Sequence, residues 1–111
     1  LVERTVSTGG APTPKSLHPR TRRLLARIGP SIRTWRRAQG LTAEQVADRA
    51  SISRPTLRTI ETHPERASFG NVMAVLAVLG VDETITTAID PLESERGRAL
   101  VLARLEPGAR P

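Results

Sequence analysis

Apolar side chains recur every three or four residues in five short segments, and a capping or breaking residue separates each segment from the next. This spacing places apolar side chains on one face of an α-helix. We expect helices over about 31–39, 43–50, 54–62, 69–79 and 82–89. Ahead of them, residues 21–28 predict a short helix or a kink, because Gly29 and Pro30 interrupt the pattern. These segments predict an all-α fold class.

Residues at the segment ends support the same boundaries. Thr42 and Gln45 have the spacing of a capping box, in which each side chain accepts a hydrogen bond from the other residue's backbone N–H. Ser53, Ser68 and Asp82 stand where their side chains can cap the next three helices. Glycine follows the segments that end at residues 39 and 79, where it supplies the left-handed stop of a helix.

The same periodicity predicts which side chains form the core. Trp35 occupies a core position of the first helix, and we expect it to be largely buried. Leu57 and Ile60 point inward from the segment 54–62. The segment 69–79 is apolar nearly all round, and it supplies most of the core. Its core side chains are Phe69, Val72, Met73, Val75, Leu76 and Leu79. The segment 82–89 adds Ile85 and Ile89.

A chain of 111 residues can form one domain with a hydrophobic core, but not two full domains. Residues 1–19 mix Gly and Pro with Ser and Thr and show no apolar period, so we expect a disordered arm. Residues 20–90 form the predicted domain. The weaker pattern in residues 91–111 predicts either a last helix or a tail.

Positive charge is concentrated at one end of the chain. The net charge is +6, and 16 of the 17 cationic residues are arginine. Residues 1–40 hold nine of these cations against Glu3 alone. Such asymmetry favours a basic face that binds a polyanion, but a merely solvated arm would give the same pattern.

Several classes of chemistry are disfavoured. Without cysteine there is no disulfide framework and no thiolate zinc site, and His18 and His63 stand apart in expected loops. We therefore expect no metal site, no cofactor and no enzymatic activity. The longest apolar run has eight residues, against the roughly 20 of a membrane-spanning helix, so we expect a soluble, cytoplasmic protein.

Two short helices joined by a tight turn, with Arg and Thr on the outer face of the second, are typical of a helix-turn-helix. The segment Leu41–Glu61, LTAEQVADRASISRPTLRTIE, closely resembles the Xre-type repressor family, and the wider resemblance covers Ile28–Ile89. It implies a compact five-helix, lambda-repressor-like domain. It also implies a homodimeric repressor that inserts residues 54–62 into the major groove of double-stranded DNA at a palindromic operator.

The sequence departs from the family pattern in two places, the turn before residue 54 and the loop after the third helix. Ser51 stands where the family usually has Gly in the turn, so we expect either an unusual backbone angle or a remodelled turn. Thr62 and His63 replace the common Gly after the third helix, and this leaves the geometry of the following loop open.

The resemblance implies a role for individual residues. Arg54, Pro55 and Thr59 face the base edges, and Arg54 is the best candidate for a bidentate guanine contact. Phosphate contacts fall to Thr42, Ala43, Arg58 and Arg66. In family members the acid that matches Glu61 pairs with an arginine of the first helix, which here is Arg36.

The run Ala88–Gly97, AIDPLESERG, is similar to small HipB-like antitoxins, which repress their own operon and neutralise a kinase toxin. This resemblance implies a toxin protein as a second partner. A third possibility is a protein adaptor that does not bind DNA. RNA recognition is disfavoured, because two aromatic residues give almost no stacking surface for unpaired bases.

Overall fold

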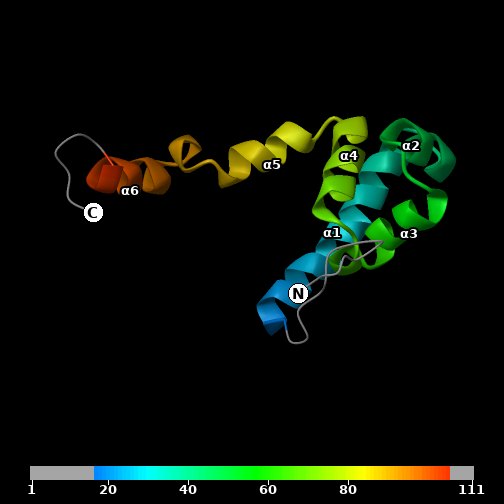
Figure 1. Cartoon of the computed structure of the whole chain (residues 1–111), viewed down its shortest axis with the longest axis horizontal. Coiled ribbons are helices and arrows are strands. Elements are labelled where there is room, and N and C mark those ends of the chain that lie inside the picture. Colours follow the sequence, from blue (N-terminus) through cyan, green and yellow to red (C-terminus); the bar gives the residue numbers. More distant parts are fainter. Residues whose placement is uncertain (1–16, 106–111) are drawn as a thin grey trace, which may run out of the picture. The chain divides into compact units, whose positions relative to one another are not determined.

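A computed structural model describes residues 17–105 of the chain, and every regular element in that range is helical (Figure 1). In chain order the elements are α1 (Pro19–Ala38), α2 (Ala43–Ala50), α3 (Arg54–Thr62), the 3₁₀-helix η1 (Pro64–Arg66), α4 (Phe69–Leu79), α5 (Asp82–Ile89), the 3₁₀-helix η2 (Pro91–Glu93) and α6 (Glu95–Leu105). The predicted all-α class is therefore confirmed.

Helix α1 is one continuous helix of 20 residues, which corrects the expected break at Gly29 and Pro30. Pro30 removes one helical hydrogen bond, but the neighbouring residues hold the helix together through packing. Gly29 and Ile32 are both buried. At Gly29 the helix lies so close to α3 that a Cβ atom there would collide with the backbone carbonyl of Glu61.

Helix α1 also begins earlier than expected. Residues 1–16 of the predicted arm lie outside the described residues, but Pro19 is already helical. His18 Nδ1 accepts a hydrogen bond from the backbone N–H of Arg20 at 3.0 Å, and Pro19 needs no hydrogen bond at the first helical position.

The predicted caps of α2, α3 and α4 are present. Thr42 and Gln45 form both hydrogen bonds of the capping box, at 2.9 and 3.0 Å. Ser53 Oγ accepts from the N–H of Thr56 at 3.1 Å, and Ser68 Oγ accepts from Asn71 at 3.2 Å. Each cap satisfies backbone donors that a helix start leaves without partners. Ser53 and Ser68 therefore fix where α3 and α4 begin.

The turn between α2 and α3 keeps its tight geometry without glycine. Ser51 adopts the left-handed conformation, with φ of 58° and ψ of 42°. Its N–H donates to Asp48 O at 3.2 Å, and the N–H of Ile52 donates to Ala47 O at 3.0 Å. The usual turn is therefore retained at the cost of a strained residue.

The core lies among α1 to α4. Its eight buried apolar side chains are Ile32, Val46, Ala47, Leu57, Ile60, Val75, Leu76 and Leu79. Helix α2 packs against α3 and α4, while α1 packs against α3, η1 and α4. This packing sets the position of α3, which carries most of the predicted site.

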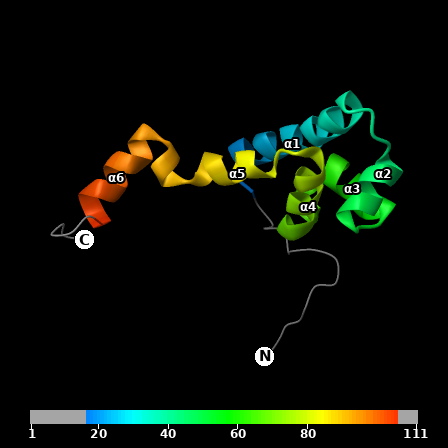
Figure 2. The ribbon, with the colours of Figure 1, turned by 90° about the horizontal axis from the view of Figure 1, so that it is seen from above.

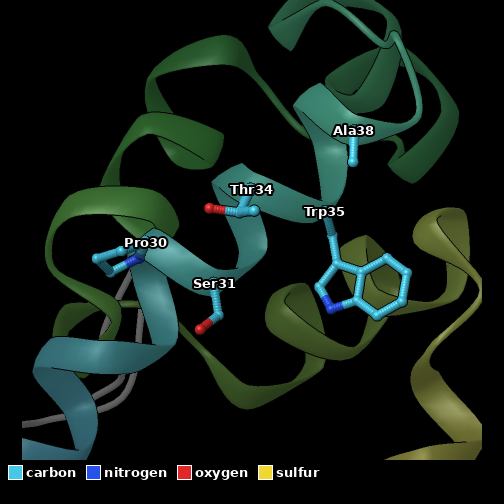
Figure 3. Close-up of a pocket in the computed structure, with 5 residues that line it drawn as sticks. All are labelled: Pro30, Ser31, Thr34, Trp35 and Ala38. Atoms are coloured by element: carbon cyan, nitrogen blue, oxygen red, sulfur yellow. The ribbon is translucent and has the colours of Figure 1, made fainter.

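Three predicted core residues are exposed: Trp35 is 49% exposed, Phe69 68% and Ile89 74%. Along α1, Ile32 and Arg36 are buried and lie about one turn apart, so Arg36 takes the inward position. Trp35 is rotated by about 100° from Arg36 around the helix axis and lines an outer pocket (Figure 3). Phe69 and Ile89 are end residues of α4 and α5, where neighbouring turns cover less of the side chain.

The chain divides into two compact units, one ending at Gly80 and the other starting at Val81. Gly80 ends α4 in the left-handed conformation at the end of the first unit, and α5 contacts η2 within the second. Asp82 is not a cap but the first residue of α5, where its charge complements the helix dipole. Of the predicted C-terminal segment, residues 95–105 form α6, and residues 106–111 lie outside the described residues.

Within residues 17–105, no single helix has both the length and the apolar character needed to cross a membrane. Helices α4 and α5 meet these criteria only when they are taken together as a broken pair, and only by length and composition.

Candidate nucleic-acid interface

Helices α2 and α3 are held by the side chains that they bury. Val46 and Ala47 of α2 and Leu57 and Ile60 of α3 are at most 1% exposed. Because an α-helix repeats every 3.6 residues, burial of Leu57 and Ile60 directs the opposite face of α3 to solvent. The exposed residues of α3 are therefore determined by its apolar pattern.

The outward face of α3 begins with arginine. Arg54, Pro55 and Arg58 are exposed, and Thr59 is half-buried. The hydroxyl of Thr59 donates a hydrogen bond to the carbonyl of Pro55 at 3.1 Å. Thr59 can therefore offer a ligand only its hydroxyl oxygen, as a hydrogen-bond acceptor. The two guanidinium groups are thus the strongest donors on this face.

Helix α3 shares a groove of about 450 Å³ with α1 and with the start of α2. Its lining residues are Arg33, Arg36, Ala43, Arg54, Pro55, Leu57, Arg58, Glu61 and Thr62. Six of these are residues that the resemblance assigns to DNA contacts or to the ion pair: Arg36, Ala43, Arg54, Pro55, Arg58 and Glu61. Thr42, Thr59 and Arg66 do not line the groove.

Arg33 is the member of this groove that sequence reasoning missed. It precedes Arg36 by three residues, which is about one helical turn, so the implied pairing of Arg36 with Glu61 could have indicated it. Together with Arg54 and Arg58 it gives the groove three exposed guanidinium groups. Such a concave basic surface suits a phosphate backbone.

Arg36 and Glu61 form a nearly buried ion pair that joins α1 to α3. Arg36 Nε donates to Glu61 Oε2 at 2.8 Å, and Nη2 donates to Oε1 at 3.1 Å. The remaining Nη1 donates to the carbonyl of Leu41 at 3.1 Å. The hydrogen bond to Glu61 raises the pKa of Arg36 further above its already high ordinary value, so Arg36 stays charged. This bidentate contact fixes the orientation of α3.

The family model described as a helix-turn-helix domain matches residues 27–87, which is more than half of the chain. The chain belongs to this helix-turn-helix family. No curated protein and no solved structure matches it. Family membership supports DNA binding, and the matched range contains both α2 and α3.

The start of α2 in the helix-turn-helix domain presents backbone donors. The capping box uses the N–H groups of Thr42 and Gln45, which leaves those of Ala43 and Glu44 without an intrahelical acceptor. Ala43 also lines the groove. The exposed carboxylate of Glu44 lies in the same first turn and opposes an anion there. The first turn of α2 therefore combines two backbone donors with one negative charge.

The loop after α3 in the helix-turn-helix domain forms without glycine. His63 has φ of −142°, and its Nδ1 lies 3.0 Å from the hydroxyl of Thr62. Arg66 ends η1 and is exposed. Among the described residues, no group of three or more His, Cys, Asp or Glu side chains is arranged to hold a metal ion.

Proposed function

We propose that this protein is a sequence-specific regulator of transcription that binds double-stranded DNA through α3. The supporting observation is the exposed N-terminal face of α3, with Arg54, Pro55 and Arg58 beside a basic groove and with the opposite face anchored in the core. A helix presented in this way fits the major groove of B-DNA.

The proposed contact residues fall into two groups, those that read bases and those that position the protein by binding phosphates. Arg54 reads a guanine through two hydrogen bonds, while Pro55 and Thr59 contact neighbouring base edges. The phosphate contacts come from Thr42, Ala43, Arg58 and Arg66. Since phosphate contacts carry no sequence information, preference for a site rests mainly on Arg54.

A dimer is needed because one recognition helix spans only a few base pairs. We propose a homodimeric repressor on a pseudo-palindromic operator, with half-sites about one helical turn, roughly 34 Å, apart. Large exposed apolar side chains on several helices, including Ile28 and Trp35, are available to a second copy. Binding of two chains to a two-fold symmetric operator would support this arrangement. Binding of one chain to a single half-site would contradict it.

The test is selection of bound sequences from a random duplex pool, followed by affinity measurements on the selected site. Replacing Arg54 (Arg54→Ala) should cost about 1–3 kcal/mol on that site and relax the preference at one base pair. Arg49→Ala is the matched control, because Arg49 is exposed in the last turn of α2 and does not line the groove. It should leave the base preference unchanged. An equal loss of affinity on every DNA sequence would show that Arg54 does not read a base.

A second candidate is an antitoxin that represses its own operon and binds a kinase toxin. It is favoured by the segment Ala88–Gly97, in which Ile89 and Leu92 are large apolar residues exposed to solvent. Apolar side chains in such positions are typical of a surface that a protein partner covers.

This second candidate is tested by mixing the protein with the kinase encoded beside it, where such a gene exists, and measuring affinity by calorimetry. Ile89→Asp and Leu92→Asp should each weaken the complex at least tenfold, which corresponds to about 1.4 kcal/mol. Thr84→Asp, an exposed change on α5, is the control. Absence of salt-dependent DNA binding alongside tight kinase binding would favour a protein adaptor instead.

A further inference from the structure

Helix α1 carries more positive charge than any other element that the structure describes. It contains seven arginines and no acidic residue. Arg36 is buried against Glu61, and the other six are exposed: Arg20, Arg22, Arg23, Arg27, Arg33 and Arg37. A helix with six unshielded charges of one sign gains from an anionic partner.

These arginines are not equivalent, because they lie on different sides of the helix. At about 100° per residue, Arg22 and Arg33 lie within roughly 40° of Gly29 around the axis. Gly29 marks the side of α1 that touches α3, since its Cα faces the Glu61 carbonyl. Arg20 and Arg27 lie on the far side, about 160–180° from Gly29.

Arg33 lies on this side of α1 and also borders the α3 surface that is proposed to bind DNA. It lines the same groove as Arg54 and Arg58, so the three guanidinium groups form one basic surface across two helices. Arg22 stands three turns earlier, about 16 Å along the helix from Arg33. Helix α1 also contacts η1, whose last residue is the exposed Arg66. Arg22 and Arg33 thus lie on the same side of α1, the side marked by Gly29.

The N-terminal half of α1 extends beyond α3 and α4 in both views of the ribbon (Figures 1 and 2). Arg22 lies in that half of α1 and is exposed. A duplex presents about one negative charge per 1.7 Å of its axis. Two arginines about 16 Å apart, Arg22 and Arg33, therefore span several phosphates.

We infer that Arg22 and Arg33 make α1 a second phosphate-contacting surface for the duplex that α3 reads. This inference rests on the proposed DNA binding of α3 and adds to it a contact with the backbone outside the segment that α3 occupies. Arg20 and Arg27 have no part in this contact, although they carry the same charge on the same helix.

The test compares two double variants of the full chain, Arg22→Gln/Arg33→Gln and Arg20→Gln/Arg27→Gln. Both remove two positive charges from α1, so a difference between them reports position rather than net charge. The probe is a 30-base-pair duplex that carries the selected site, and affinity is followed by fluorescence anisotropy over a series of salt concentrations.

We expect the slope of log affinity against log salt, which is negative, to become less steep by about 2 in Arg22→Gln/Arg33→Gln, because each lost phosphate contact changes it by about 0.9. Affinity at 0.1 M salt should fall on the order of tenfold or more, with unchanged base preference. Arg20→Gln/Arg27→Gln should keep a slope close to that of the wild type. Equal slopes for the two double variants would overturn the inference.

Failure of this inference differs from failure of the proposed function. If the wild type shows no salt-dependent duplex binding, the proposed function is wrong. If Arg54→Ala loses its base preference while Arg22→Gln/Arg33→Gln keeps the wild-type slope, only the role of α1 is wrong. Melting curves verify folding, and Arg22→Gln alone, away from the Arg36–Glu61 pair, should still make the slope less steep by about 1.

Discussion

The two compact units of this chain are both helical, but they differ in what their helices bury. All eight buried apolar side chains belong to the unit that ends at Gly80. In the described part of the unit that starts at Val81, no side chain is buried, and Ile89, Leu92 and Leu102 are more than half exposed. Local helix signals are therefore sufficient to form the helices of the second unit, but not to give it a core.

Local contacts hold the second unit instead. Asp90 Oδ1 accepts from the N–H of Leu92 at 2.9 Å, and Ser94 Oγ accepts from the N–H of Gly97 at 3.0 Å. Arg98 donates to the carbonyl of Leu92 at 3.0 Å. Exposed hydrogen bonds of this kind contribute about 1 kcal/mol each, far less than a packed core.

The largest expected effect is loss of core packing in the first unit. Leu57 is 1% exposed, so Leu57→Ala should lower the free energy of unfolding by about 2–5 kcal/mol. The matched change in the second unit is Leu102→Ala, at a residue 56% exposed, and it should cost less than about 0.5 kcal/mol. Urea unfolding followed by circular dichroism measures both. Similar losses would mean that Leu102 is covered in solution.

A smaller effect is expected at two glycines that lie against backbone. In Gly29→Ala the new methyl group meets the carbonyl of Glu61, which should cost about 1–3 kcal/mol and lower the main melting transition. In Gly97→Ala the methyl group meets the backbone of Pro91. This change should speed hydrogen exchange in α6 and leave the main transition in place. An equal drop in melting temperature for the two variants would show that the units unfold together.

The smallest effect concerns the strained turn. Ser51→Gly should relieve about 1 kcal/mol of left-handed strain and lose part of that gain to the freedom of glycine in the unfolded chain. We expect a net stabilisation of about 0.5 kcal/mol, visible as a higher melting temperature. Ser51→Ala keeps the strain and should show no gain. A lower melting temperature for the glycine variant would indicate that Ser51 makes a contact that compensates for its backbone.

Much of the first unit could be predicted from sequence because its signals are local. The capping box at Thr42 and Gln45 and the caps at Ser53 and Ser68 act within one helical turn, and they set the boundaries of α2, α3 and α4. The buried pair Leu57 and Ile60 then determines which face of α3 is exposed. The outward Arg54, Pro55 and Arg58 follow from the same periodicity.

The errors arise where tertiary packing outweighs a local signal. Gly29 and Pro30 read as a break, but the close contact with α3 uses the missing side chain of Gly29 and keeps α1 continuous. Trp35 is apolar and looks like a core residue, but Arg36 takes the inward position because it pairs with Glu61. Arg33 was missed because its place in the groove depends on how α1 packs against α3, which the periodicity of α1 alone does not give.

Gly29 also limits how this sequence can vary. The carbonyl of Glu61 that fills the space above it belongs to the backbone, so no exchange of a neighbouring side chain can make room for a larger residue. In a library of random variants selected for folding, we expect this position to accept glycine almost alone, while exposed positions of the same helix such as Arg23 accept many residue types. Along α1, the smallest residue is thus the least replaceable.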